Sequence, residues 1–210
     1  MRAGKPAGRW SARFGATELR RFRPIDTRAL YRIRNDRSVR AHMSDRRPLS
    51  YRRHRHWVLA NLVRRRTLDL YMVVRAGMPI GIGLLRNFRG PTAEFGLMFR
   101  DTERHGVTAF HSAVLILDHA FRDLRLSRLT GYIVRGNARS LRFGRGLGAR
   151  TVKSDRPGHV KVEFTPPACY AAPAVARRLF RRRGGHAPAM SEAAGVTGAV
   201  PSLRGRPGRP

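Results

Sequence analysis

Gly106 stands where a strand-like run of the chain gives way to a helical one, in the stretch MFRDTERHGVTAFHSAV (98–114). A helix that begins at such a turn directs free backbone N–H groups and the positive end of its dipole toward the turn, and both attract phosphate. An ordinary helix start has the same sequence appearance. The residues around Gly106 therefore allow two interpretations, a phosphate-binding turn or a helix start with no ligand.

Histidine and cysteine are the other residues whose spacing bears on chemistry. His54 and His56 lie two positions apart on a predicted helix, about 200° around its axis, so they cannot bind one metal ion. His111 and His119 can share one side of their helix but lack acidic or thiol companions, so we predict no metal site. The lone Cys169 excludes an intramolecular disulfide and fits a reducing compartment, with a partly buried bystander thiol as the simplest interpretation.

Charge is the most unusual feature of the composition. The chain has 210 residues and a formal net charge of +31, and its 44 basic residues comprise three lysines and 41 arginines. A general arginine bias explains this imbalance as well as a polyanionic partner does. The C-terminal RGRPGRP (204–210) resembles an AT-hook core, a short motif that lies in a narrow minor groove. Nucleic-acid association through the basic tails is therefore carried as an alternative.

Domain organisation follows from the contrast between the ends and the middle of the chain. Residues 1–16 and 184–210 are rich in Gly, Ala, Pro and Arg and lack apolar periodicity, so we predict two disordered basic tails. Residues 17–183 then form one domain with its own core. No apolar run approaches the roughly 20 residues of a membrane span, and the N-terminus lacks a secretory h-region. We expect a soluble cytoplasmic protein without membrane contact.

The elements that must position the candidate residues follow from the periodicity of the domain. Helices are expected over 25–36, 50–65, 107–124 and 137–148, and strands over 17–24, 93–100, 127–134, 149–154 and 159–166, with a hairpin over 68–88. The helix over 107–124 should carry a continuous apolar stripe on one face and polar residues on the other; the stripe is Val107, Phe110, Val114, Leu117, Phe121 and Leu124, and the polar face holds Asp118, Arg122 and Asp123. The order β-α-α-β-β-β-α-β-α-β-β predicts an α/β (α+β) fold. Its central sheet should be mixed and mostly antiparallel, with about six to seven strands flanked by about four helices.

Five segments in this order are similar to landmarks of the GNAT N-acetyltransferase superfamily, and most of all of its RimJ/RimL-type and amino-sugar branches. They are Arg34-Asn35-Asp36 followed by Val39 and Met43; Ser50, His54 and Trp57 of SYRRHRHW; PIGIGLL (79–85); AEFGLMF (93–99); and NARSLRFGRGLGA (137–149). Together they span residues 17 to about 165. The resemblance implies transfer of an acetyl group from acetyl-coenzyme A to a primary amine, on a small molecule such as an amino sugar nucleotide or on a protein N-terminus.

The resemblance also implies where the coenzyme binds. The pyrophosphate would meet the turn before the long helix, at Arg104, His105, Gly106, Val107 and Thr108. The pantetheine arm would pair with the strand backbone at Gly96, Leu97 and Met98, and Asn137 would cap the later helix and bond the coenzyme. The turn departs from the family pattern, because Glu103 stands where a polar or basic residue is expected and Thr108 where a small one is expected.

Catalytic residues are implied by the same comparison. Glu94 is the candidate general base, directly or through water, with a solvated strand residue or an arginine partner as the alternative. The tyrosine that protonates the departing thiolate in many relatives is replaced by Gly144, so Ser140 is the nearest hydroxyl and Tyr132 a second choice. Arg34, Asn35, His54 and Trp57 are the candidate acceptor-binding residues, with a structural histidine as the alternative for His54 and a solvated basic face as the alternative for Arg34.

Two further interpretations stay open at this stage. A catalytically weakened GNAT-fold protein would keep the fold and bind a ligand or partner, as the departures at Glu103, Thr108 and Gly144 indicate. A homodimer is compatible with the sequence, which contains nothing that decides it.

Overall fold

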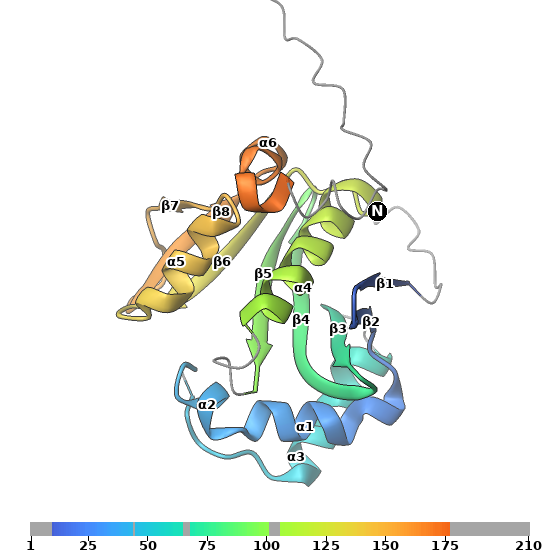
Figure 1. Ribbon diagram of the computed structural model, residues 1–210. Helices are drawn as coiled ribbons and strands as arrows, with labels where there is room; N and C mark the ends of the chain where they lie inside the picture. Colours follow the sequence, from blue (N-terminus) through green and yellow to red (C-terminus); the bar gives the residue numbers. More distant parts are fainter. Residues whose placement is uncertain (1–9, 44, 65–67, 101–105, 177–210) are drawn as a thin grey trace, which may run out of the picture.

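One eight-stranded sheet runs through the protein (Figure 1). The computed structural model describes residues 10–43, 45–64, 68–100 and 106–176. The strands are β1 (Ser11–Phe14), β2 (Thr17–Arg21), β3 (Leu68–Arg75), β4 (Met78–Arg89), β5 (Thr92–Phe99), β6 (Arg128–Val134), β7 (Arg150–Val152) and β8 (His159–Phe164). Their order in the sheet is β1-β2-β3-β4-β5-β6-β8-β7, and every neighbouring pair is antiparallel except β5 with β6.

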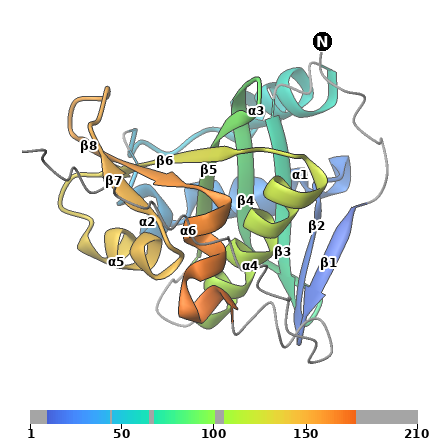
Figure 2. The same cartoon turned by 90° about the horizontal axis from the view of Figure 1, so that it is seen from above.

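Helices cover both faces of this sheet (Figure 2). They are η1 (Pro24–Asp26), α1 (Thr27–Asn35), α2 (Arg37–Arg40), α3 (Tyr51–Val58), η2 (Leu59–Arg64), α4 (Gly106–Asp118), η3 (His119–Asp123), α5 (Ala138–Gly146) and α6 (Pro166–Ala171). The two faces bury two separate apolar cores. One core joins α4 to the sheet and contains Leu85, Leu117 and Leu129, whereas the other contains Leu30 of α1, Val58 of α3 and Ile82 of β4.

The parallel strands β5 and β6 stay together for only three residue pairs. Thr92, Ala93 and Glu94 pair with Arg128, Leu129 and Thr130, and beyond these pairs the strands diverge, as Figure 1 shows. From Phe95 to Phe99, β5 pairs with β4 and with no second strand among the described residues, so within that part of the chain its other edge has no strand partner. Backbone groups at such an edge need another hydrogen-bonding partner, which a bound ligand can supply.

Helix α4 is buried more completely than its sequence pattern predicts. The expected stripe of Val107, Phe110, Val114 and Leu117 is only partly correct, because Val107 is 63% exposed. In the second half of the helix all side chains from Ser112 to Asp118 are buried, because the sheet lies on one side and α6 covers another. Asp118, expected on the solvent face, is buried and accepts a hydrogen bond from Tyr170 of α6.

The predicted fold is confirmed, with two corrections at the N-terminal edge. The sheet has eight strands, one more than the upper number expected, and the additional strand is β1. The domain therefore begins before residue 17, because Ser11–Phe14 pairs with Thr17–Arg20. Four residues are too few for an alternating pattern to show, yet Ala12 is buried and Phe14 packs on His111. The predicted tails at 1–9 and 184–210, and the boundary at 183, lie outside the described residues.

Candidate active site

A cleft of about 370 Å³ occupies the space between the diverging strands. Its walls come from β5, β6, β8 and α5, together with Ser38 and Val39 of the short helix α2 and His42 and Met43 of the turn after it. The volume lies within the range of about 300–1,000 Å³ that is usual for sites of small molecules and cofactors. The cleft therefore exists because β5 and β6 separate, and its walls are drawn from segments far apart in the sequence.

The free edge of β5 forms the floor of the cleft. Gly96, Leu97 and Met98, the residues predicted to pair with pantetheine, all line it. Opposite them on β6 lies Gly131, which the sequence reasoning did not single out. A Cβ atom at Gly131 would lie 3.1 Å from the Val162 side chain, so a larger residue would crowd the point where the strands part. A glycine within a strand often marks such a close approach, so Gly131 in the predicted strand 127–134 was the sequence signal for this part of the cleft.

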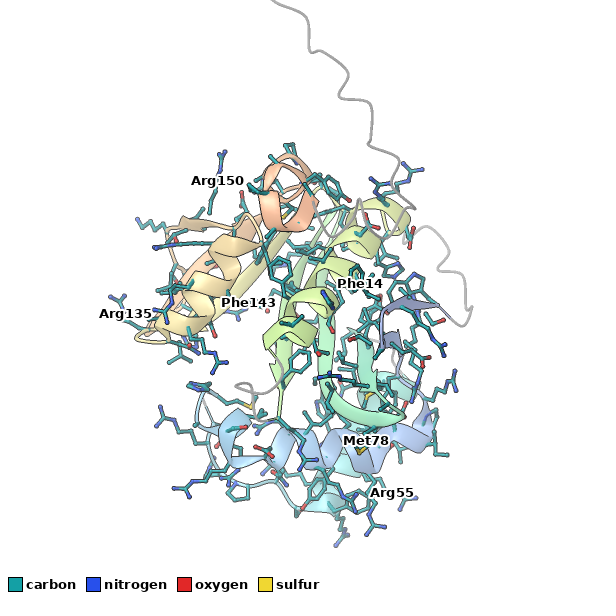
Figure 3. The ribbon with its side chains drawn as sticks, in the orientation of Figure 1. Phe14, Arg55, Met78, Arg135, Phe143 and Arg150 are labelled. Atoms are coloured by element: carbon teal, nitrogen blue, oxygen red, sulfur yellow. The ribbon has the colours of Figure 1, made fainter. Side chains whose placement is uncertain are left out.

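Helix α5 supplies the polar groups of the opposite wall. Asn137 caps the helix as predicted, because its Oδ1 accepts a hydrogen bond from the backbone N–H of Ser140 at 3.0 Å. Asn137, Ser140 and Gly144 all line the cleft. Phe143 points from α5 toward α4 and meets Phe110 edge-on at 6.2 Å (Figure 3). These contacts fix α5 against α4, so Ser140 is held in the wall of the cleft.

The start of α4 is only partly described. The helix begins at Gly106, and Gly106 and Val107 are exposed there. Thr108 is buried, and its carbonyl accepts a hydrogen bond from the Ser112 hydroxyl at 2.8 Å. Arg104 and His105, predicted to help bind the pyrophosphate, lie outside the described residues. Their role and that of the helix start stay predictions.

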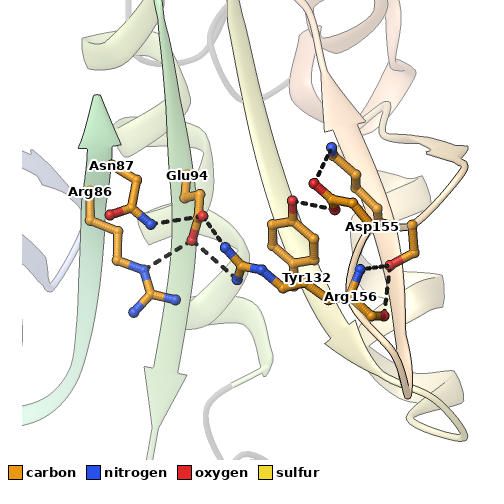
Figure 4. A network of polar contacts seen from close by, with 8 residues as sticks. Arg86, Asn87, Glu94, Tyr132, Asp155 and Arg156 are labelled. Atoms are coloured by element: carbon orange, nitrogen blue, oxygen red, sulfur yellow. Dashed lines mark hydrogen bonds and ion pairs between the residues drawn. The ribbon is translucent and has the colours of Figure 1, made fainter. Parts of the chain in front are cut away.

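Glu94 lies at the last position of β5 that pairs with β6, and its carboxylate is surrounded by hydrogen-bond donors (Figure 4). Oε1 accepts hydrogen bonds from Asn87 Nδ2 at 2.8 Å and from Arg156 Nη2. Oε2 accepts from Arg86 Nε at 3.1 Å and from Arg156 Nη1 at 3.5 Å. A carboxylate has about four lone-pair sites, so four donors leave none of them free.

This environment also changes the acidity of Glu94. Burial by itself raises the pKa of the carboxyl group, but the hydrogen bonds from Asn87 and Arg156 and the charges of Arg86 and Arg156 lower it further than burial raises it. The net pKa lies below its ordinary value, so Glu94 is ionised at neutral pH and weakly basic. The assignment of Glu94 as general base stays a prediction, and its alternative as an arginine partner describes the contacts well.

Arg156 links Glu94 to a second set of polar residues beyond β6. Its guanidinium carbon lies 3.6 Å from the centre of the Tyr132 ring, which is the geometry of a cation–π contact. The Tyr132 hydroxyl donates to Asp155 at 2.8 Å, and Lys161 donates to the same carboxylate at 3.4 Å. Arg86, Asn87 and Arg156 were absent from the predicted site. They come from β4 and the β7–β8 connection, and no local motif relates them to Glu94.

The four predicted acceptor-binding residues do not line the cleft. The side-chain amide of Asn35 bonds both the carbonyl and the N–H of Leu49, at 2.8 and 2.9 Å, so it holds the connection to α3 in place. Trp57 is exposed on α3. His54 is buried, and burial together with the charge of Arg34 lowers its pKa. Arg34 donates to the Asp45 carbonyl at 3.3 Å.

There is a physical reason why these four residues do not line the cleft. Arg34, Asn35, His54 and Trp57 lie on α1 and α3, whereas α2 and the turn after it reach the cleft, through Val39 and Met43 of the first similar segment among others. Asp36 makes the turn between α1 and α2, because it accepts hydrogen bonds from the N–H and hydroxyl of Ser38 at 3.0 and 2.6 Å and from Arg100 at 3.2 Å. Direct contact of Arg34, Asn35, His54 and Trp57 with an acceptor stays a prediction.

The fold and the cleft together define a mixed α/β protein in which two parallel strands separate beside a cleft. Residues 17–150 match the sequence model of the acetyltransferase (GNAT) domain. The chain therefore belongs to the GNAT acetyltransferase family, as the resemblance predicted. No curated protein sequence matches the chain.

Solved structures of acetyltransferases share this fold at low sequence identity. Spermidine N-acetyltransferase from Vibrio cholerae, solved with CoA and spermine, has a TM-score of 0.64 at 15% identity and covers 74% of this chain and 98% of its own. Ribosomal-protein-alanine N-acetyltransferase from Brucella melitensis has a TM-score of 0.57 at 17% identity, covering 70% and 98%. Apo FdhC, a nucleotide-linked sugar GNAT, has a TM-score of 0.66 at 15% identity, covering 86% and 100%.

None of the helices described is both long and apolar enough to cross a membrane. Within the same residues, no three His, Cys, Asp or Glu side chains come together in a group suited to a metal ion.

Proposed function

We propose that the protein transfers an acetyl group from acetyl-coenzyme A to a primary amine in the cleft between β5 and β6. The observation that carries this proposal is the free backbone edge of β5 from Phe95 to Phe99, which forms the floor of a cleft in a GNAT-family fold. Pantetheine contains two amides and can hydrogen-bond to such an edge as an added strand does. Gly96, Leu97 and Met98 would form this contact, and the start of α4 at Gly106–Thr108 would face the pyrophosphate.

Ser140 is the residue we assign to the departing thiolate. When the amine attacks the thioester carbonyl, the carbon–sulfur bond breaks and the sulfur leaves with the electron pair. The Ser140 hydroxyl lies in the cleft wall, on a helix whose first turn is fixed by Asn137, and it can donate a proton there. Gly144, one helical turn further, leaves room for the coenzyme where many relatives carry tyrosine.

Glu94 has a positioning role in this proposal. Because its lone pairs accept hydrogen bonds from Arg86, Asn87 and Arg156, it holds two guanidinium groups at one side of the cleft. We place the amine substrate at this side. The attacking amine would lose its proton to solvent or through a water at this cluster. Such a cluster suits an acceptor with an anionic group, since guanidinium binds phosphate and carboxylate well.

The charges in the cleft favour one class of acceptor. Glu94 is the only acidic residue among the described residues that line it, and two arginines already neutralise it. Arg86, Arg156, His42 and His159 also line the cleft. A polycationic acceptor would meet repulsion here, so a nucleotide-linked amino sugar is favoured over a polyamine, and a peptide N-terminus is the second candidate.

The test measures coenzyme binding first and turnover second. Isothermal titration of the purified protein with acetyl-coenzyme A should give a dissociation constant below about 1 mM, the range of typical substrate affinities. Release of free coenzyme A would then be followed with a nucleoside-diphosphate-linked amino sugar, an alanine-initiated peptide and spermidine. The sugar should react fastest and spermidine slowest. Absence of coenzyme binding would refute the proposed function.

Binding without turnover would instead support the alternative of a catalytically weakened protein. The observation behind that alternative is Gly144 in the usual tyrosine position together with the occupied lone pairs of Glu94.

A further inference from the structure

The helices α1 to α3 carry a local excess of positive charge. Residues 27–58 contain ten arginines and two aspartates, a net charge of +8 over 32 residues. The 33 residues of 68–100 contain four arginines and two acids, a net charge of +2. The second stretch holds the strands β3, β4 and β5, which are more buried than the helices, so the difference reflects exposure as well as composition, and it concentrates positive charge on α1 to α3.

Few of these charges are neutralised within the protein. The two aspartates of the segment are already used, Asp36 by Arg100 and Asp45 by Arg47, each at 3.2 Å. Five arginines are exposed and form no ion pair with another described residue: Arg52, Arg53 and Arg55 of α3, and Arg28 and Arg32 of α1. Figure 3 shows Arg55 projecting from α3 into solvent. An exposed group of like charges is stabilised by a polyanionic partner, which releases its counterions on binding.

Exposed aromatic rings lie among these arginines. Tyr51 and Trp57, at either end of α3, are each 42% exposed. Tyr51 packs edge-on against Tyr31 of α1 at 5.2 Å, and the buried His54 lies nearly parallel to Trp57, with ring centres 6.2 Å apart and planes 28° apart. These contacts hold the two rings in place while part of each stays open to solvent. Aromatic rings of this kind stack on unpaired bases.

We propose that the outer surface of α1 and α3, defined by Arg28, Arg32, Arg52, Arg53, Arg55 and Trp57, binds single-stranded nucleic acid. The arginines would contact phosphates, and Trp57 at one end of α3 and Tyr51 at the other would each stack on a base. Charge alone would suit an acidic protein equally well, but the exposed rings favour a partner with unpaired bases. This function is separate from acetyl transfer, although α2, in the same layer, lines the cleft and would place a bound strand beside it.

The experiment uses the full-length protein and fluorescein-labelled single strands of RNA and of DNA with the same sequence. Fluorescence anisotropy gives the affinity and its dependence on salt concentration. Replacing Arg52, Arg53 and Arg55 together by Gln should weaken binding at least tenfold, and should reduce the salt slope by about 2, since each single-strand phosphate contact contributes about 0.7. Trp57→Leu should weaken binding about tenfold with an unchanged salt slope.

The matched control replaces Arg75, Arg89 and Arg150 by Gln, which removes the same charge from exposed positions on β3, β4 and β7. It should change affinity less than about twofold. An equal loss of affinity in the two triple variants would show that nucleic acid is attracted by the positive charge of the whole protein, tails included, and would overturn the proposal. An unaltered affinity of Trp57→Leu, with polyglutamate competing as well as RNA, would assign the surface to acidic proteins instead. Preference between the RNA and DNA strands identifies the kind of nucleic acid.

Discussion

Glu94 of β5 and Arg156 of the β7–β8 connection form an ion pair across the line where β5 and β6 separate. The pair ties the two halves of the sheet together beside the cleft, where backbone pairing between the strands has already ended at Thr130. Arg86 and Asn87 of β4 donate hydrogen bonds to the same carboxylate. The Glu94 side chain therefore joins β4, β5 and the β7–β8 connection.

Replacing Glu94 by Gln should therefore destabilise the protein at neutral pH. The carboxylate is largely buried while its arginine partners are partly exposed, so we expect a loss of about 2 kcal/mol in the free energy of unfolding. Because the folded pKa of Glu94 is lowered, its contribution is full above the ordinary value of 4.5 and is lost as the pH falls through the folded pKa. Guanidinium unfolding at pH 7 and at lower pH measures the change, and the difference between wild type and variant should shrink in acid.

The matched control for this variant is Glu163→Gln, which removes the more exposed pair with Arg128 at 3.5 Å. Glu163→Gln should lower the free energy of unfolding by less than about 1 kcal/mol. Kinetics separate positioning from base catalysis by Glu94. A positioning role predicts that Glu94→Gln keeps the shape of the pH profile of kcat/KM, whereas disappearance of its acidic limb would make Glu94 the base.

Ser140→Ala should lower kcat and leave coenzyme binding nearly unchanged. The hydroxyl is assigned to the thiolate, whose charge develops only during the reaction, so its removal should reduce kcat about tenfold or more. The N–H of Ser140 still bonds Asn137 in the variant, so the helix start is retained. Steady-state kinetics and calorimetry are the measurements, with Ser11→Ala on exposed β1 as the control. An unchanged kcat would remove Ser140 from the mechanism.

Gly144→Leu should block the cleft without unfolding the protein. A Cβ atom at this position would meet only the Cβ of Ala149, at 3.7 Å, which is an ordinary contact. Leucine also favours the helix by roughly 0.8 kcal/mol over glycine, so the melting temperature of the free protein should not fall. The rest of the side chain would enter the cleft and should weaken acetyl-coenzyme A binding at least tenfold, by roughly the cost of one overpacked contact.

Gly146→Leu is the control for this substitution, because Gly146 is exposed on the same helix and a Cβ there would meet nothing within 4 Å. It should gain similar helix propensity while keeping coenzyme affinity. Equal binding by the two leucine variants would place the coenzyme elsewhere.

His119 should make stability fall as the medium becomes acidic. Burial lowers its pKa, and the repulsion from Arg21 adds to this, against the hydrogen bond and charge of Asp123 and the charge of Asp69, which raise it. Because the folded pKa lies below the ordinary value of 6.5, the unfolded chain takes up the proton first. The stabilising contribution is therefore present above pH 6.5 and is lost as the pH falls through the folded pKa, by up to about 1.4 kcal/mol per pH unit.

His119→Gln should flatten this part of the curve, measured by chemical denaturation from neutral to mildly acidic pH. The variant also loses the packing of the imidazole on Trp10, at 4.0 Å, so its stability should be lower throughout. His54 has a lowered pKa as well and leaves a residual slope of the same sign. His56→Gln, on the exposed side of α3, is the control, and a slope unaltered by His119→Gln would contradict the prediction.

Cys169 should be unreactive in the folded protein. Burial raises the pKa of its thiol to about 12, against a smaller effect of the Thr165 backbone, so almost no thiolate is present at neutral pH. A thiol reagent such as dithionitrobenzoate should detect no cysteine in the native protein and one after denaturation. The same reagent can then report free coenzyme A in the assay. Rapid modification of the native protein would show that α6 opens.

Much of the fold could be predicted from the sequence because its signals are local. Asn137 caps α5 as expected, and Ser50 caps α3, through hydrogen bonds that their side chains accept from the backbone N–H groups of Ser140 and Arg53. The meander β3-β4-β5 and the long helix α4 follow from alternation and from periodicity within each segment. By contrast, β1 gave no such signal, because a four-residue edge strand owes its structure to pairing with β2.

What the sequence by itself determined was the order of the elements, the GNAT resemblance and the candidate edge at Gly96 to Met98. Only the tertiary structure decided which side chains surround Glu94, because Arg86 and Arg156 approach it from strands and loops that share no local pattern. It also decided that α2, rather than α1 or α3, reaches the cleft. Secondary structure is governed by neighbours along the chain, whereas charge pairing, burial and pKa depend on distances that exist only after the sheet has formed.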